Sequence, residues 1–445
     1  MNQTVMTMTV ILAGAVGCAA LSVDDVPVFY CSPDGEDRDE RGTEAEPFKT
    51  VGYALEHIGS ACGATVVLLD GEYGRVRADQ AFDRPVAIRA RNEREAVFEG
   101  LFVVGAKNLT FDGLTIDHRN SERAANVVQI SRSSYITVRN CLITHGRDGF
   151  QNTDTLKINQ RSHHVLIEGN EIFDATDEEI DILGDTHDIV VRRNIVYQYR
   201  TRERPEALVS NKMGASRGVF EGNLFANLNP RSSNGALRFG GGERAGQESR
   251  VMIAVGNLFV NTVGRGAQTF VGSKKSLVAH NIFVNHDDRR TGPIAIYSNY
   301  PRGDIANDDV FVINNVFYNV GSDRPVYWFG RDREHPSFPE NRLFAHNLYW
   351  NPDRSTPRSD IHELAEEEGA LFADPLFVGD PSKLEGRPTA EWFEILELRP
   401  ESPFLDNKID LTELDLPDEL RRFLRDYRGE GDDPWYREIN RDRRP

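Results

Sequence analysis

The segment VLIEGNEIF (Val165–Phe173) is followed by the similar segment IVVRRNIVY (Ile189–Tyr197), and this recurrence decides the fold. Both segments place short apolar runs on each side of one asparagine. The same pattern recurs through most of the chain, with anchors at Asn140, Asn170, Asn194, Asn223, Asn257, Asn281, Asn315 and Asn347 and a degenerate copy around Gly113. Successive anchors are 24 to 34 residues apart. Such a period is too short for a propeller blade of about 40 residues.

The repeat predicts a solenoid of short strands. Runs of Val, Ile, Leu and Phe with a two-residue alternation are typical of strands, and they lie too close together for helical crossovers. One coil of three strands and three turns accounts for the spacing, and stacking such coils buries a continuous core. Asparagine tolerates the left-handed conformation at a corner and can bond its equivalent in the next coil. We therefore expect an all-β, right-handed parallel β-helix with structural asparagines.

Both ends of a solenoid require caps, because they expose unpaired strands. The segment from Pro47 to Ile58 is predicted to be an amphipathic helix that plugs the N-terminal end. We expect residues 1–21 to be an export signal, residues 28–372 to form the β-helix with this cap, and residues 373–445 to form a loop-rich C-terminal cap and tail. Within that tail, the charged stretch Gly429–Pro445 is expected to be extended or disordered.

The composition limits the partners. The 445 residues are 39% hydrophobic and carry a net charge of −18, which argues against nucleic acid. An anionic glycan would bind only where the surface is locally basic or holds a metal. Apolar residues 9–21 predict export to the periplasm, the outer membrane or the medium. Lipidation of Cys18, which would be the chain's one membrane contact, and ordinary cleavage nearby remain alternatives. We expect a monomer.

The other cysteines have different expected roles. Cys31 and Cys62 flank the predicted N-terminal cap and could form a disulfide in an exported protein. Cys141 is expected to be a small buried side chain. The sequence has no CxxC pair, which argues against a zinc site of that type.

The beginning of the chain resembles bacterial β-helix polysaccharide lyases. The similar motifs are YCSPDG (Tyr30–Gly35), GTEAEPFKTVGYALE (Gly42–Glu56) and DGEY (Asp70–Tyr73). The most similar family is that of the family-nine pectate lyases, which use a Ca²⁺ ion held by carboxylates on neighbouring coils and a lysine base. This resemblance implies a calcium site formed by Asp154, Asp177, Glu178 and Asp181, with Lys212 as the base. Glu178 departs from the family pattern, which has an aspartate there.

The chemistry of these residues supports the same assignment. Ca²⁺ prefers six to eight oxygen ligands, and stacked coils about 4.8 Å apart would bring the carboxylates together. Removing the proton α to a uronate carboxylate requires stabilisation of the developing negative charge. Lys212 would remove this proton if burial or positive neighbours lowered its pKa. The alternative is a solvated acidic turn beside a surface lysine, with no metal site and no catalytic base.

Further candidates lie on nearby repeats. Arg238, one coil beyond Lys212, is a candidate catalytic residue because a guanidinium binds a carboxylate through two hydrogen bonds. Arg217 could bind the same group, and His163 and Tyr197 could contact sugar, with His164 and Tyr199 close to them. Ordinary structural roles are the alternative for each.

The sequence leaves several functions open. The first is a Ca²⁺-dependent lyase that cleaves an acidic, uronic-acid-containing polysaccharide by β-elimination, with a C5-epimerase as a close variant. The second is a glycoside hydrolase that uses the same carboxylates as acid and base. The third is a non-catalytic glycan-binding surface protein.

Overall fold

The fold is taken from a computed structural model, which describes residues 26–118, 126–144, 153–198, 207–227, 235–241, 246–264, 266–286, 291–297, 307–320, 325–330 and 338–441. The predicted export signal, with Cys18, lies outside these residues, as does Tyr199. No helix within the described ranges has the length and apolar character needed to cross a membrane.

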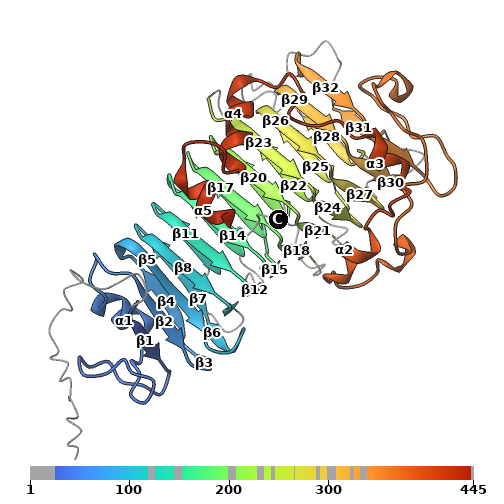
Figure 1. Cartoon of the computed structure of the whole chain (residues 1–445). Coiled ribbons are helices and arrows are strands. Elements are labelled where there is room, and N and C mark those ends of the chain that lie inside the picture. The colour runs from blue at the N-terminus through green and yellow to red at the C-terminus, as the bar shows by residue number, and fades with distance from the viewer. Residues whose placement is uncertain are drawn as a thin grey trace, which may run out of the picture.

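The described strands form three parallel sheets that wind into a right-handed β-helix (Figure 1). The three sheets are called A, B and C. Along the chain, each coil contributes one strand to sheet C, then one to sheet A and then one to sheet B. Sheet A contains β1 (Val28–Cys31), β2 (Ala64–Leu68), β5 (Ala81–Ala90), β8 (Lys107–Asp112), β11 (Ser134–Arg139), β14 (His163–Glu168), β17 (His187–Arg192), β20 (Ser216–Glu221), β23 (Ser249–Val255), β26 (Ser273–Ala279), β29 (Asp308–Ile313) and β32 (Arg342–Ala345).

The other two sheets complete the cylinder. Sheet B contains β3 (Gly71–Glu72), β6 (Ala96–Phe98), β9 (Thr115–Asp117), β12 (Leu142–Thr144), β15 (Glu171–Phe173), β18 (Ile195–Gln198), β21 (Leu224–Asn227), β24 (Leu258–Val260), β27 (Ile282–Val284), β30 (Val316–Tyr318) and β33 (Leu348–Trp350). Sheet C contains β4 (Arg75–Ala78), β7 (Gly100–Val104), β10 (Val128–Ser131), β13 (Leu156–Asn159), β16 (Ile180–Leu183), β19 (Val209–Lys212), β22 (Leu237–Gly240), β25 (Gln268–Val271), β28 (Ile294–Tyr297) and β31 (Tyr327–Phe329).

The repeat asparagines form a buried ladder between sheets A and B, as the sequence predicts. The Asn170 amide donates to Asn194 Oδ1 at 3.0 Å, and each later amide bonds its equivalent in the next coil, through Asn223, Asn257, Asn281, Asn315 and Asn347. One anchor is corrected, because Cys141 and not Asn140 occupies the ladder position: the Cys141 N–H donates to Asn170 Oδ1. Cys141 is fully buried, as expected.

The N-terminal cap follows the prediction. Helix α1 (Val51–His57) buries Val51, Ala54 and Leu55 in the core that continues into the cylinder. The pairing of Cys31 with Cys62, which the sequence left open, does not form, because Cys31 keeps a free thiol. Its sulfur lies fully buried at the end of β1, 3.7 Å from the Thr50 carbonyl oxygen. Burial raises the pKa of this thiol to about 12, so it is unreactive.

The C-terminal segment covers the sides of the cylinder as well as closing its end. Ile361 and Leu364, beside the 3₁₀ helix η1 (Leu364–Glu366), complete the core at the end of the cylinder. The next residues, with η2 (Pro381–Lys383), α2 (Glu391–Ile395) and α3 (Pro403–Asn407), bury Phe377, Trp392 and Phe404 against the outer face of sheet B. The predicted division of the chain at residue 373 remains a prediction.

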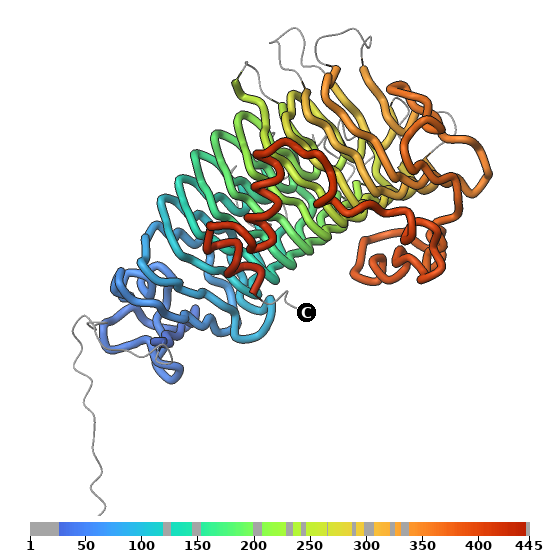
Figure 2. The backbone as a smooth tube through the Cα atoms, turned by 45° about the horizontal axis from the view of Figure 1, so that its top comes forward, coloured from blue at the N-terminus to red at the C-terminus, as the bar shows by residue number. Residues whose placement is uncertain are grey.

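The last described residues return along the outer face of sheet A (Figure 2). We call residues 409–441, which include α4 (Asp418–Tyr427) and α5 (Pro434–Ile439), the strap. The strap covers an apolar stripe of outward side chains in register, formed by Leu166, Val190, Val219, Ile253, Leu277 and Phe311. The expectation of an extended or disordered end is wrong for α5, because Trp435 and Tyr436 are buried.

Candidate functional site

Sheet C carries the candidate site on its outer face. The apolar clusters outside the cylinder involve sheets A and B, and the described residues of sheet C contribute to neither of them. The outward positions of neighbouring strands align Lys157 of β13 with Asp181 of β16, then with Ser210 of β19 and Arg238 of β22. This face therefore presents polar and charged groups where the other two faces are covered.

Three buried carboxylates meet at this face. Asp154 precedes β13, Glu178 precedes β16, and Asp181 lies within β16, as the sequence predicts. Their oxygens lie within 4.8 Å of one another, and the three residues are at most 2% exposed. The Glu178 N–H donates to Asp154 Oδ1 at 3.2 Å, which fixes one coil on the next. We call Asp154, Glu178 and Asp181 the carboxylate cluster.

Two lysines contact the carboxylate cluster. Lys212, at the end of β19, places Nζ 2.6 Å from Glu178 Oε1 and 3.2 Å from Asp181 Oδ1. Lys157 places Nζ 2.8 Å from Asp154 Oδ2 and 2.7 Å from Asp181 Oδ2. The predicted neighbourhood of Lys212 and the acids is thus present. Lys157 is an addition that the sequence reasoning missed, although its place in the strand aligned with Asp181 was a usable signal.

Arg238 completes the cationic side of the site. Its terminal nitrogen lies 3.3 Å from Glu178 Oε1, the same oxygen that Lys212 contacts. In register Arg238 aligns with Ser210, two residues before Lys212, so it lies slightly earlier along its strand than predicted. Ser210 lies between Asp181 and Arg238, and its hydroxyl is fully buried without a hydrogen-bond partner among the described residues. Such a buried hydroxyl requires explanation, and a ligand oxygen would satisfy it.

The pKa shifts at the cluster reflect burial and the mutual influence of its charged groups. Burial raises the pKa of Asp154 well above its usual range, and the neighbouring Asp181 and Glu178 raise it further. Burial lowers the pKa of Lys212, but Glu178 and Asp181 outweigh this effect and the net shift is upward. The lysine therefore stays protonated beside Glu178 and Asp181. It would become a base only after these carboxylates were neutralised.

Two acids beside the cluster have other positions. Asp177 is partly exposed and is not among the acids whose oxygens meet there. Glu179 points away from the cluster and accepts hydrogen bonds from Thr155 Oγ1 at 2.8 Å and from the Ala175 N–H at 2.9 Å. Burial raises the pKa of Glu179 well above its usual range. The sequence reasoning missed Glu179, since in a run of acids only the strand boundary reveals which side chain turns inward.

The three predicted sugar-binding residues lie on the other two sheets. Arg217 of β20 pairs with Asp188 at 2.6 Å and stacks on Phe423 of the strap. His163 of β14 stacks on His187, and burial with its two histidine neighbours lowers its pKa. Tyr197 of β18 is buried and donates to Glu171 at 3.0 Å. The structure therefore does not bring these residues to the carboxylate cluster.

The donor set fits a calcium ion. Asp154, Glu178 and Asp181 offer only oxygen ligands, which is the preference of Ca²⁺. Burial is the largest cause of the raised pKa of Asp154, and repulsion from Asp181 and Glu178 adds to it, so a bound cation would relieve that repulsion. The carboxylate oxygens that would bind the ion already contact the ammonium groups of Lys157 and Lys212, so an ion here would compete with both lysines.

Comparisons with known proteins agree with the fold. Residues 90–227 match the family model described as "Right handed beta helix region". No curated protein sequence matches the chain. The structure is similar to that of pectate lyase Pel9A, with a TM-score of 0.53, 10% identity, and coverage of 85% of this chain and 90% of that one.

Two further similar structures have different activities. PfbA, a surface adhesin of Streptococcus pneumoniae, has a TM-score of 0.46 and 12% identity, with 67% of this chain and 79% of that chain covered. The catalytic domain of a GH87 α-1,3-glucanase has a TM-score of 0.45 and 11% identity, with 80% of this chain and 70% of that chain covered. At 10% identity the likeness to the pectate lyase concerns the fold alone, and it agrees with the three parallel sheets of the structure: the chain is a right-handed parallel β-helix.

Proposed function

We propose that the protein is an exported, Ca²⁺-dependent lyase that cleaves a uronic-acid-containing polysaccharide by β-elimination. The observation that carries the proposal is the contact of Lys212 Nζ with two carboxylates of a buried cluster, at 2.6 and 3.2 Å. The site joins acids that suit a cation to an amine that suits proton removal. The similarity to the fold of a pectate lyase supports the same class of reaction.

Asp154, Glu178 and Asp181 would hold the ion, and bound Ca²⁺ would supply positive charge against the carboxylate of the substrate. Once Glu178 and Asp181 are neutralised, the interactions that raise the pKa of Lys212 are lost and its burial lowers that pKa. Neutral Lys212 would then take the proton α to the uronate carboxylate at Nζ. The electron pair left on that carbon would form the new double bond as the β carbon–oxygen bond breaks, and the leaving oxygen would take a proton from water. Arg238, 3.3 Å from Glu178, would orient that carboxylate through its guanidinium.

The test is the release of unsaturated sugar ends from a panel of uronate polymers, followed by ultraviolet absorbance. We expect product with Ca²⁺, none with a calcium chelator, and a loss of at least about 100-fold with Lys212→Ala. Lys383→Ala, in η2 on the side of sheet B, is the matched control and should keep full activity. Turnover that chelation leaves unchanged would overturn the calcium requirement. Proton exchange at C5 without cleavage would indicate an epimerase instead.

A glycoside hydrolase is the second candidate, and one observation favours it. Lys157, Lys212 and Arg238 already contact the three acids, so the charges of the cluster can balance without a metal. Asp154, with its raised pKa, would then be the general acid beside an ionised carboxylate. Saturated reducing ends formed in the presence of chelator would support this function. Glycan binding without any turnover would indicate the non-catalytic alternative.

A further inference from the structure

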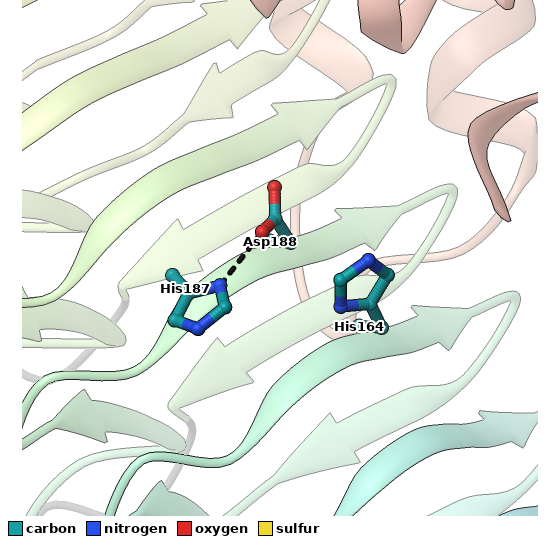
Figure 3. A group of neighbouring side chains, drawn as sticks. All are labelled: His164, His187 and Asp188. Atoms are coloured by element: carbon teal, nitrogen blue, oxygen red, sulfur yellow. Dashed lines mark hydrogen bonds and ion pairs between the residues drawn. The ribbon is translucent and has the colours of Figure 1, made fainter. Parts of the chain in front are cut away.

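A second group of metal-binding residue types lies on sheet A, under α5. It contains His163 and His164 of β14, His187 and Asp188 of β17, and Asp433, which caps α5. Figure 3 shows His164, His187 and Asp188 close together on two neighbouring strands. None of these residues belongs to the carboxylate cluster, and we call them the histidine cluster.

A backbone irregularity common to both coils presents these side chains outward. His163 pairs with His187, and Val165 pairs with Ile189, so one residue between them in each strand lies outside the regular alternation. Those residues, His164 and Asp188, have left-handed φ angles of 54° and 55°. Each coil therefore directs two consecutive side chains toward the strap. The rings of His163 and His187 stack at 4.9 Å, with planes 4° apart.

The donor atoms lie in contact pairs. His164 Nδ1 is 2.8 Å from His163 Nδ1, and His164 Nε2 is 3.0 Å from Asp433 Oδ2. His187 Nδ1 is 2.7 Å from Asp188 Oδ2. If His164 donates its Nδ1–H to His163, its Nε2 carries a lone pair. In this tautomer Nε2 faces the Asp433 carboxylate with a lone pair, an arrangement that a bound cation would stabilise, whereas in the other tautomer Nε2–H donates to Asp433 Oδ2.

Three potential ligand atoms lie near one another. Ligand atoms of His164, His187 and Asp188 lie within 4.8 Å of one another. Around a zinc ion, ligand atoms are about 3.3 Å apart. The ligand atoms must therefore move closer together when an ion binds, and the His187 side chain, which is 42% exposed, is the most accessible of the three. A hydrogen bond from a ligating imidazole to an outer partner is the usual arrangement, and His163 is such a partner for His164.

We propose that His164, His187, Asp188 and Asp433 bind a divalent transition-metal cation of the zinc class, which fastens α5 to sheet A. Mixed imidazole and carboxylate ligands select such ions, whereas the all-oxygen carboxylate cluster suits Ca²⁺. The ion would connect β14 and β17 with Asp433, which lies 269 residues beyond His164. The site is independent of the reaction on sheet C.

The test uses the full chain without a histidine tag, titrated with Zn²⁺ by calorimetry and with Co²⁺ by visible absorption, in Ca²⁺-containing buffer. We expect one equivalent of metal per chain and intense Co²⁺ bands that indicate tetrahedral ligation. His187→Ala and Asp433→Asn should each weaken Zn²⁺ binding by about tenfold or more. His57→Gln, at the exposed side of α1, and Asp181→Asn should leave it unchanged.

A second measurement tests the fastening and does not depend on how well the variants fold. Zn²⁺ should slow amide exchange in residues 435–440 of the wild type and not of His187→Ala. The proposal is overturned if the wild type binds Zn²⁺ no more tightly than His187→Ala, or if Asp181→Asn abolishes binding. Binding that leaves exchange in α5 unchanged would overturn the fastening. In that case the contacts of the histidine cluster are hydrogen bonds alone.

Discussion

The asparagine ladder and the carboxylate cluster are both buried, polar and built by stacking coils, yet their polar groups have opposite effects on the stability of the fold. In the ladder each amide donates to the next one, and Asn257 also donates to the Phe220 carbonyl oxygen at 2.8 Å. In the cluster three acids share one volume, and the pKa of Asp154 rises because of burial and its acidic neighbours. Repeated neutral groups that satisfy each other stabilise a fold, whereas an unrepeated group of charges marks a site.

The largest effect is expected from Asp181→Asn. Asp181 contacts both lysines and faces the other two acids, so its loss should reduce kcat/KM for the uronate substrate by at least about 100-fold. Thermal unfolding should change little, because the amide keeps the shape of the side chain. Kinetics and calorimetry on the same sample check this. Near-normal turnover would remove the distinction between cluster and ladder.

Asn257→Leu is expected to lower the stability of the fold and to leave activity unchanged, the reverse of Asp181→Asn. The side chain accepts from the Asn223 N–H and the Asn223 amide at 2.9 Å each and donates two further bonds. Losing four buried hydrogen bonds should lower the free energy of unfolding by about 2–4 kcal/mol. Activity per folded molecule should persist. Asn319→Ala, in an exposed amide pair, is the control and should cost far less.

A smaller, stabilising effect is expected from Asp154→Asn. The folded pKa of Asp154 lies above its ordinary value of 3.8, so the folded protein retains a proton that the unfolded chain releases. Its contribution is therefore full below about pH 4 and is lost as pH rises through the folded pKa. At pH 7 the variant should have a higher free energy of unfolding than the wild type. In urea titrations at several pH values, the free energy of unfolding of the variant should fall less with rising pH than that of the wild type. A steeper fall would contradict the upward pKa shift of Asp154.

The smallest effect is expected from Tyr436→Phe. The Tyr436 hydroxyl donates to Asp188 Oδ1 at 2.8 Å, and its loss should lower the free energy of unfolding by about 1 kcal/mol. Limited proteolysis should cut the strap sooner. Tyr53→Phe, which removes an exposed hydroxyl bonded to Asp39, should be nearly neutral. Equal effects in the two variants would mean that the strap contact contributes nothing specific.

The sequence predicts the cylinder well, because its signal repeats. The period between asparagines defines one coil, so residues one coil apart, such as Asp181 and Ser210, can be aligned by counting along the chain. The resemblance to family-nine pectate lyases singled out Lys212 beside the acids, and the same alignment agrees with it. The anchor at Asn140 was misplaced by one residue, since a cysteine takes the ladder position there and the pattern contains no rule for that exchange.

Other parts of the molecule carry no repeating signal. Arg217, His163 and Tyr197 are near the acids in sequence, but the coil divides among three sheets, and only the corners decide which face a residue joins. No repeating pattern in the sequence predicts the strap. Its one signal is the apolar outward stripe on sheet A, which cannot be recognised until the inward positions are assigned. Sequence reasoning therefore finds what recurs and misses single contacts between distant segments.

The strap changes how such a cylinder comes apart. In an ordinary solenoid each coil touches only its neighbours, so the ends can fray one coil at a time. Here one stretch of chain lies across sheet A from Leu166 to Phe311, and it holds Lys275 through Glu419 and Arg192 through the Ile439 carbonyl oxygen. Coils that do not contact each other are thereby connected through the strap, so we expect them to unfold together. A chain that stopped before Leu411 would lose this coupling and leave a ribbon of aliphatic side chains open to self-association.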